Sequence, residues 1–97
     1  MKAVFLPEAE EELLAQIKYY EDRKPGLGAR YVAEVMAALD YVVETPHRFP
    51  VIRKPALRRL GLKRFPFAIY FRELDSVVQV VAIAPHRRQP AYWRDRF

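Results

Sequence analysis

Apolar residues in the first half of the chain recur at the spacing of an α-helix. The first stripe, spaced i, i+4, i+8 and i+11, consists of Ala9, Leu13, Ile17 and Tyr20. Pro7 suits the first helical turn, because its missing N–H would have no partner within the helix there. The sequence Pro25-Gly26-Leu27-Gly28 then breaks the pattern. We therefore predict a helix over residues 7–22 that ends in a tight turn.

A second apolar stripe follows this turn. It consists of Val32, Val35, Met36, Leu39, Val42 and Val43. Pro46 disfavours helical geometry at Thr45 and so sets the end of the second helix. Residues 7–45 are therefore predicted to form two helices joined by a short turn, which makes the helices antiparallel.

The remaining segments have the patterns of strands and loops. Residues 2–6 are a short apolar stretch suited to a strand, and residues 46–56 contain three prolines, which predicts a stiff irregular connector. Further strands are predicted over residues 57–64, 65–72 and 77–84, with a turn at residues 73–76. The last run is rich in β-branched residues, which predicts a central strand buried on both faces.

The order of these elements defines the fold class. It is α+β, in the order β-α-α-β-β-β, with an antiparallel-rich sheet packed against the helical hairpin. The chain has 97 residues, 52% hydrophobic and 13% aromatic, which is enough for one core and too few residues for two. We therefore expect a single domain over residues 1–97.

Composition excludes several classes of chemistry. Cysteine is absent, which rules out disulfides, thiolate metal sites and a cysteine nucleophile. The two histidines, His47 and His86, are too far apart in sequence for a histidine metal motif, so no metal or cofactor is expected. Ser76, the only serine, lies in a predicted turn, which disfavours a serine triad. The apolar runs are too short for a signal peptide or a membrane span, so a cytoplasmic location is expected.

Charge is divided unevenly along the chain. Residues 1–52 carry six basic and nine acidic residues, whereas residues 53–97 carry eleven basic and three acidic ones, a net charge of +8. Most of the basic residues in this half are arginines, whose planar fork suits phosphate and carboxylate groups. We expect the arginines to line one concavity that is open to RNA, DNA or an acidic protein. A solvated basic face without a ligand is the alternative, and the four glutamates of residues 8–12 are ascribed to the helix dipole alone.

The segment 86–96 combines groups that metal-independent RNA cleavage requires. Such cleavage needs one group to accept the 2′-hydroxyl proton, another to protonate the leaving oxygen, and cations to hold the phosphate. His86 and Tyr92 are the candidates for proton transfer. Tyr92 or Trp93 is the candidate for stacking on a base. The candidates for binding phosphate are Arg59, Lys63, Arg64 and Arg88.

Each of these residues also has a structural interpretation. His86 directly follows a predicted strand and is equally suited to capping local backbone groups. Tyr92 and Trp93 are suited to folding back onto the core. The basic residues 58, 59, 63 and 64 are suited to binding an acidic partner in place of RNA. His47 follows Pro46 and is expected to be a loop or helix-end histidine.

Three features together resemble the RelE/ParE superfamily of bacterial toxins. They are the helical hairpin closed by Pro25-Gly26-Leu27-Gly28, the strand of residues 64–71, and the ending of residues 86–93. The resemblance covers essentially the whole chain in the right order. It implies a small basic toxin of a type II toxin–antitoxin system, which an acidic, partly disordered antitoxin neutralises in a hetero-oligomer.

The resemblance leaves two targets open. ParE-like members poison DNA gyrase, and RelE-like members cleave mRNA in the ribosomal A site. The turn at residues 25–28 and the strand at residues 65–70 are more similar to the ParE or plasmid-stabilisation branch, which we favour. In RelE-like members a catalytic arginine occupies the place of His86, a basic residue that of Arg88, and a catalytic tyrosine that of Tyr92. An inactive relative that only binds its antitoxin is the third interpretation.

The resemblance also implies how the antitoxin binds. An acidic amphipathic segment would place its apolar side on the helical hairpin and the sheet, and its charges would neutralise the basic half of the toxin. A segment that orders on binding pays an entropy cost, so the expected interface is large.

Overall fold

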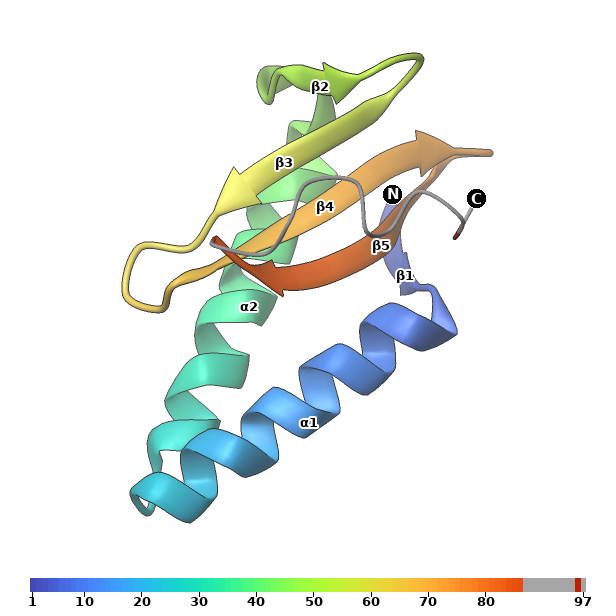
Figure 1. Cartoon of the computed structure of the whole chain (residues 1–97). Helices are drawn as coiled ribbons and strands as arrows, with labels where there is room; N and C mark the ends of the chain where they lie inside the picture. The colour runs from blue at the N-terminus through green and yellow to red at the C-terminus, as the bar shows by residue number, and fades with distance from the viewer. Residues whose placement is uncertain (87–95, 97) are drawn as a thin grey trace.

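Two helices pack on one side of a five-stranded sheet (Figure 1). The computed structural model describes residues 1–86 and Arg96. The helices are α1 (Pro7–Arg23) and α2 (Leu27–Glu44), followed by a short 3₁₀-helix, η1 (Pro46–Arg48). The strands are β1 (Lys2–Phe5), β2 (Val51–Arg53), β3 (Leu57–Gly61), β4 (Phe67–Leu74) and β5 (Val77–Pro85). This arrangement confirms the α+β class. Neither α1 nor α2 is long and apolar enough to cross a membrane.

The strand order in the sheet is β1-β5-β4-β3-β2. β1 runs parallel to β5, and the other neighbouring strands are antiparallel. β5 therefore has a neighbour on each side, as predicted for the most apolar run. The connector of residues 46–56, expected to be irregular, contains the additional strand β2. β2 lies at the edge of the sheet, where the prolines on either side of it, Pro50 and Pro55, are tolerated. Proline has no N–H to donate, and on the outer side of an edge strand no partner strand needs one.

The helical hairpin is closed by a glutamate and two glycines. α1 ends at Arg23, one residue beyond the predicted end, and Gly26 has a φ of 89°, which favours glycine. The Glu21 carboxylate accepts hydrogen bonds from the N–H groups of Gly26, at 2.9 Å, and Gly28, at 3.0 Å. A carboxylate thus satisfies free amides at the start of α2, where the helix dipole also favours negative charge. A Cβ atom on Gly28 would lie only 2.7 Å from the Ile17 carbonyl oxygen, so the two helices meet closely here.

The main core lies between the helices and the sheet, and Tyr31 is at its centre. Tyr31 is fully buried, and its ring centroid lies 5.2 Å from those of Tyr20 and Phe65. The apolar stripe predicted for α2 omits Tyr31 and includes Met36, which is 39% exposed in the structure. The periodicity was right for Val35, Leu39 and Val42, but a tyrosine that buries its whole ring extends the stripe toward the start of the helix.

The strand predicted at residues 65–72 is shifted in the structure, where β4 covers Phe67–Leu74. Phe65 and Pro66 belong to the turn before it, which is closed by a 2.8 Å hydrogen bond from the Leu62 N–H to the Phe67 carbonyl oxygen. Phe65 still packs against the main core. Phe65 is therefore a turn residue whose side chain packs into the core. The apolar pattern of a sequence does not distinguish such a residue from one buried within a strand.

A β-bulge in β5 makes this strand contribute to both faces of the sheet. Tyr70 is opposite Ala82 and Phe71 is opposite Val80, which leaves Val81 as the extra residue. Val81 and Ala82 are fully buried in a second, small cluster with Leu57, on the outer face that points away from the helices. The expectation of a central strand buried on both faces is therefore correct.

Candidate functional site

Arg59 and His86 meet on the outer face of the sheet. Arg59 lies on β3 opposite Tyr70 of β4, and His86 directly follows β5. The Arg59 Nη2 atom is 2.8 Å from the His86 Nδ1 atom. The Arg59 Nε–H donates to the Tyr70 hydroxyl at 3.4 Å, and the guanidinium carbon lies 5.9 Å from the centroid of the Tyr70 ring. Two residues predicted from sequence, Arg59 and His86, are thus brought together by three strands.

The alternation of β3 separates Arg59 from its neighbour Arg58. Arg58 is opposite Phe71, which belongs to the main core, so it points to the helix side of the sheet. Its guanidinium donates to the Phe49 carbonyl oxygen and lies 3.5 Å from the Nδ1 atom of His47, which is in η1 as expected for a helix-end histidine. The prediction that the arginines line one concavity is therefore wrong for Arg58, because consecutive strand residues face opposite sides.

His86 is held by its backbone as well as by its ring. Its N–H donates to the Pro66 carbonyl oxygen at 2.9 Å, so the contact with local backbone is made by the main chain and leaves the imidazole to Arg59. A guanidinium has only donors, so Nδ1 must be the acceptor and the proton of a neutral ring is on Nε2. A Cβ atom on Gly61 would lie 3.3 Å from the His86 Cε1 atom, so glycine leaves room for this ring.

Lys63 and Arg64 lie in the turn between β3 and β4, fixed by a glutamate of α2. Their consecutive N–H groups donate to the Glu34 Oε2 atom at 2.9 and 3.1 Å. Successive backbone N–H groups of this kind form a small anion-binding concavity, which the Glu34 carboxylate fills. Both basic side chains are exposed. Sequence reasoning missed Glu34 because its hydrogen-bond partners are about thirty residues further along the chain.

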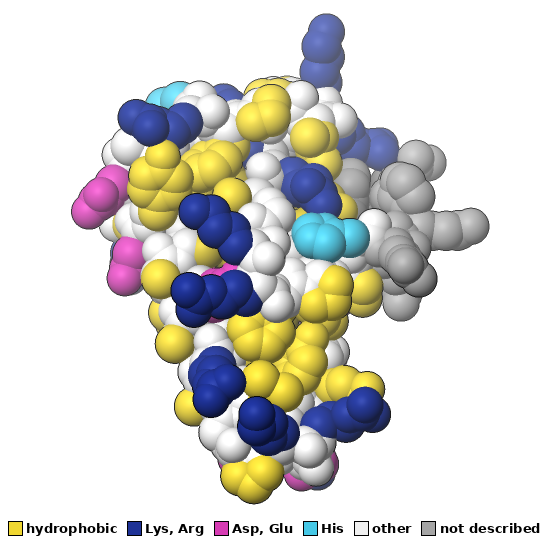
Figure 2. Space-filling model, turned by 90° about the vertical axis from the view of Figure 1, so that its left-hand side faces the viewer, with side chains coloured by type: hydrophobic (Ala, Val, Ile, Leu, Met, Phe, Trp, Pro, Cys, Tyr) yellow, Lys and Arg dark blue, Asp and Glu magenta, His cyan; other side chains and the backbone are white. Residues whose placement is uncertain are grey.

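A groove runs between α2 and this turn, and we call it the α2 groove. It has a volume of about 940 Å³. Its apolar lining includes Ala33, Ala37 and Leu60, and its basic lining consists of Arg30, Lys63 and Arg64. Figure 2 views the side of the molecule on which the β3–β4 turn lies and shows Lys and Arg side chains spread around hydrophobic ones. The surface therefore combines apolar contact area with positive charge.

Two predicted site residues, Arg88 and Tyr92, lie outside the described part of the chain, as does Trp93. Arg96 is described, and its guanidinium forms an ion pair with Glu12 of α1 at 2.8 Å. The interpretation that the helix dipole alone explains the early glutamates is therefore wrong for Glu12, which has a partner 84 residues away in sequence.

Within residues 1–86 together with Arg96, no three His, Asp or Glu side chains are grouped so that they could hold a metal ion.

Comparison with known proteins gives a family and a fold. Residues 3–90 match the family model described as "ParE toxin of type II toxin-antitoxin system, parDE". No curated protein sequence matches the chain. A structure titled "Chromosomal ParDE TA system from P. aeruginosa" is similar with a TM-score of 0.76 at 20% identity, covering 88% of this chain and 95% of that one.

A structure of the isolated E. coli RelE toxin is similar with a TM-score of 0.65, also at 20% identity, covering 95% of this chain and 90% of that one. At this identity the two structures establish the shared fold, and the family match establishes membership. The chain belongs to the ParE toxin family of type II toxin–antitoxin systems, within the RelE/ParE superfamily.

Proposed function

We propose that this toxin arrests growth by inhibiting DNA gyrase, and that its antitoxin prevents this. The observation that carries the proposal is the match of residues 3–90 to the ParE family, because gyrase poisoning is the activity that the ParE resemblance implies. A gyrase inhibitor needs a binding surface and no proton transfer of its own. Gyrase is a cytoplasmic target, so we place the toxin in the cytoplasm.

The geometry around His86 supports binding over chemistry. The ring nitrogen that a general base would use, Nδ1, already accepts a hydrogen bond from Arg59 at 2.8 Å. To take up a proton there, the imidazole must first break its contact with a permanently charged guanidinium. The pair is therefore better suited to presenting a cationic, hydrogen-bonding surface than to moving protons in a reaction.

The α2 groove supports the proposal for the antitoxin. Its alanines and Leu60 offer the apolar surface that an amphipathic segment buries, and Arg30, Lys63 and Arg64 offer the charge that an acidic segment neutralises. We place one acidic amphipathic segment of the antitoxin in this groove, against α2 and the β3–β4 turn.

The target is tested with purified toxin in two assays, DNA supercoiling by gyrase and mRNA cleavage on programmed ribosomes. We expect the toxin to inhibit supercoiling and to leave the mRNA intact. Arg59→Ala should need about tenfold more protein for the same inhibition, because a charged contact with the target is lost. The control is Lys54→Ala, which removes the same charge from an exposed position outside the groove and the Arg59–His86 pair.

The second candidate function is ribosome-dependent mRNA cleavage. It is favoured by the placement of a guanidinium, an imidazole and the Tyr70 phenol on one face of the sheet. In that case mRNA is cleaved, and His86→Ala or Tyr92→Phe abolishes cleavage and toxicity. Full toxicity of both variants would rule out the proton-transfer scheme.

The third interpretation is an inactive relative. Such a protein binds its antitoxin but leaves supercoiling, mRNA and cell growth unaffected, and this result would reject gyrase inhibition.

A further inference from the structure

β3 extends beyond the strand that borders it on the outside. β2 pairs with β3 only at Leu57 and Arg58, whereas β3 continues to Gly61. Figure 1 shows β2 beside the first part of β3 alone. The α2 groove lies at the part that β2 leaves open, because its lining includes Leu60, Gly61 and Leu62. Among the described strands, the end of β3 therefore has no neighbour on the side of the groove.

Gly61 contributes to both sides of this open edge. It lines the α2 groove. A Cβ atom at this position would lie 3.3 Å from the His86 Cε1 atom and 3.7 Å from the Arg59 Nη1 atom, on the outer face of the sheet. Because glycine has no side chain, only the main chain separates the groove from the Arg59–His86 pair. A chain that lies in the groove at Gly61 is therefore within reach of the Arg59 guanidinium.

The hydrogen-bond partners of Arg59 are uncharged groups. Its Nη2 atom lies 2.8 Å from the His86 Nδ1 atom, which can accept only from a ring that is neutral at this position. Its Nε–H donates to the Tyr70 hydroxyl at 3.4 Å. Within residues 1–86 and Arg96, Arg59 forms no ion pair. Its charge is therefore available to a carboxylate from a partner.

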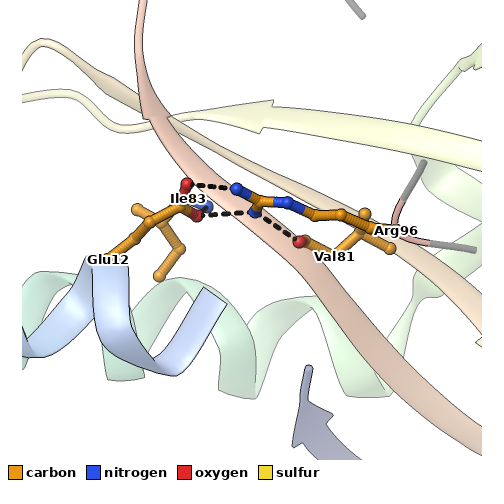
Figure 3. Close-up of polar contacts among 4 residues, drawn as sticks. All are labelled: Glu12, Val81, Ile83 and Arg96. Carbon is orange, nitrogen blue, oxygen red and sulfur yellow. Dashed lines mark hydrogen bonds and ion pairs between the residues drawn. The ribbon is translucent and has the colours of Figure 1, made fainter. Parts of the chain in front are cut away.

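Arg96 shows how an arginine of this fold binds a carboxylate (Figure 3). Its two terminal nitrogens donate to the two oxygens of Glu12, at 3.0 and 2.8 Å. Hydrogen bonds between charged groups are roughly twice as strong as those between neutral ones, and the fork of arginine matches the two carboxylate oxygens. A carboxylate that reaches Arg59 is therefore a better acceptor than the His86 imidazole.

The charges of the α2 groove favour an acidic occupant. Its basic lining residues are Arg30, Lys63 and Arg64, and its acidic lining residue is Glu34. The Glu34 Oε2 atom already accepts from the N–H groups of Lys63 and Arg64. A second copy of this chain, with a net charge of +5, would meet like charges here. The acidic antitoxin segment proposed for the groove is therefore the occupant that can present a carboxylate to Arg59.

We infer that Arg59 is shared between antitoxin and target: an acidic side chain of the antitoxin segment passes over Gly61, takes the Arg59 guanidinium from His86 and so withdraws it from the target. This inference rests on the proposed function, because it assumes that the antitoxin lies in the α2 groove and that Arg59 contacts the target.

The consequence is that two partners compete for one guanidinium. The antitoxin gains an ion pair at Arg59, and the target loses the charge that it would contact. The antitoxin can thus neutralise the toxin from the groove without covering the outer face of the sheet.

The test measures the affinity of the purified cognate antitoxin for Arg59→Ala, His86→Ala and the double variant by isothermal titration calorimetry. Arg72→Ala is the matched control. Arg72 is an arginine of β4 whose Nε–H donates to the neutral Gln79 side chain at 2.8 Å, and it does not line the groove. Lys63→Ala reports separately on occupation of the groove. Far-UV circular dichroism and thermal unfolding show whether each variant is folded.

We expect Arg59→Ala to weaken antitoxin binding about tenfold, because an ion pair is lost. His86→Ala should strengthen binding about fivefold, because the free toxin no longer has to give up the Arg59–His86 hydrogen bond. In the Arg59→Ala background, His86→Ala should change nothing further, since both substitutions act on one interaction. Arg72→Ala should bind as the wild type does.

The imidazole signals give a direct readout of the same exchange. The chain has two histidines, His47 and His86, so their ring nitrogens can be followed separately by ¹⁵N NMR. Saturation with antitoxin should move the His86 Nδ1 signal toward its position in Arg59→Ala, because the hydrogen bond from Arg59 is lost in both. His47 does not line the groove and should keep its signal.

Three results overturn the inference, and they separate it from the proposed function. If folded His86→Ala binds the antitoxin no better than the wild type, His86 does not compete for Arg59. If Lys63→Ala weakens binding and Arg59→Ala does not, the antitoxin lies in the groove without reaching Arg59. If neither variant weakens binding, the placement of the antitoxin in the groove is rejected together with the inference.

A fourth result separates the antitoxin from the target. If the Arg59 and His86 variants behave as expected while even the wild type leaves gyrase unaffected, capture of Arg59 by the antitoxin is supported and gyrase is rejected as the target.

Discussion

Tyr31 buries a hydroxyl group that has no hydrogen-bond partner among the residues that the structure describes. Its ring fills the space between the helices and the sheet, next to Tyr20 and Phe65. The apolar contacts of the ring stabilise the fold, whereas the desolvated oxygen costs free energy. Burial, followed by the nearby Tyr20 and Glu12, raises the pKa of Tyr31 well above its ordinary value of 10.0. The residue therefore stays protonated in the folded protein at pH values where free tyrosine ionises.

Tyr31→Phe is expected to keep the stability of the protein or to raise the free energy of unfolding by up to about 1 kcal/mol, since only the unsatisfied oxygen is removed. Urea unfolding at neutral pH measures this. Tyr31→Ala is the contrasting variant and should cost about 3–5 kcal/mol through the cavity it leaves. A loss above about 1 kcal/mol in the Phe variant would mean that the hydroxyl has a partner in solution.

The same residue gives a pH dependence with a defined sign. The unfolded chain ionises Tyr31 near pH 10, whereas the folded chain holds the proton to higher pH, so folding is linked to proton binding. The contribution is fully present below pH 10 and is lost as pH rises above it. The stability of the wild type should therefore fall relative to that of Tyr31→Phe in alkaline urea titrations. Tyr20, whose pKa is also raised by burial, is present in both proteins and cancels in the difference.

Single carboxylates connect the elements of this fold. Glu21 links α1 to the first turn of α2, Glu34 links α2 to the β3–β4 turn, and Glu12 links α1 to β5. In each case the acceptor is a side chain and a donor is a backbone N–H that no strand or helix satisfies. Acidic residues in the negatively charged half of the chain therefore complete the backbone hydrogen bonding of the fold.

Glu34→Gln should loosen the β3–β4 turn without unfolding the protein. A neutral acceptor binds the N–H groups of Lys63 and Arg64 more weakly than a carboxylate does, and we expect a loss of about 1 kcal/mol in stability. Hydrogen exchange of these two amides should accelerate, while that of the amides in β5 should not. Equal acceleration in β5 would show global destabilisation and would contradict the local role of Glu34.

The two glycines of the hairpin turn should respond to alanine for different reasons. Gly28→Ala places a Cβ atom 2.7 Å from the Ile17 carbonyl oxygen, so the helices must separate, at a cost of about 1–3 kcal/mol. Gly26→Ala meets no atom within 4 Å but forces a side chain into a φ of 89°, at a cost of about 1–2 kcal/mol. Gly26→Asn should recover part of that loss, because asparagine tolerates positive φ, whereas Gly28→Asn should not. Thermal unfolding of the four variants distinguishes strain from steric overlap.

Elements with strong local signals were predictable from sequence. Proline and glycine fixed the ends of α1 and α2 to within a residue or two, since their backbone preferences act locally. The predicted start of β4 is two residues too early, because Phe65 is apolar and partly buried although it lies in a turn. β2 is not predicted, because it has only three residues and Pro50 and Pro55 lie close to it. In the candidate site, Arg59 and His86 were identified singly. Their contact and that of Glu12 with Arg96 depend on tertiary packing across the sheet, which no local pattern encodes.

At the scale of the whole molecule, the net charge of +5 is spread over several surfaces. Arg59 is on the outer face, Arg58 is beside η1, and Lys63 and Arg64 flank the α2 groove. Partners can therefore meet different cations on different sides of the protein. Arg59 and His86 do not line the α2 groove, but Gly61, which does, lies beside both of them.

Antitoxin binding should depend on salt and on the cations of the groove. Raising NaCl from 0.1 to 0.5 M should weaken binding of the cognate antitoxin about tenfold, because the attraction of opposite charges is screened. Lys63→Ala should reduce both the affinity and its salt dependence, whereas Lys54→Ala, also an exposed lysine, should reduce neither. Isothermal titration calorimetry at several salt concentrations measures both. An equal effect of the two variants would show that net charge, and not the groove, attracts the antitoxin.

The parallel pairing of β1 with β5 joins segments about 75 residues apart in sequence, and β5 lies between β1 and β4. During translation the helical hairpin and the β3–β4 pair can form early, but the sheet closes only when the final strand has left the ribosome. Nascent and prematurely terminated chains therefore lack the finished fold. The folded toxin is therefore expected only after β5 has been synthesised and has paired with both β1 and β4.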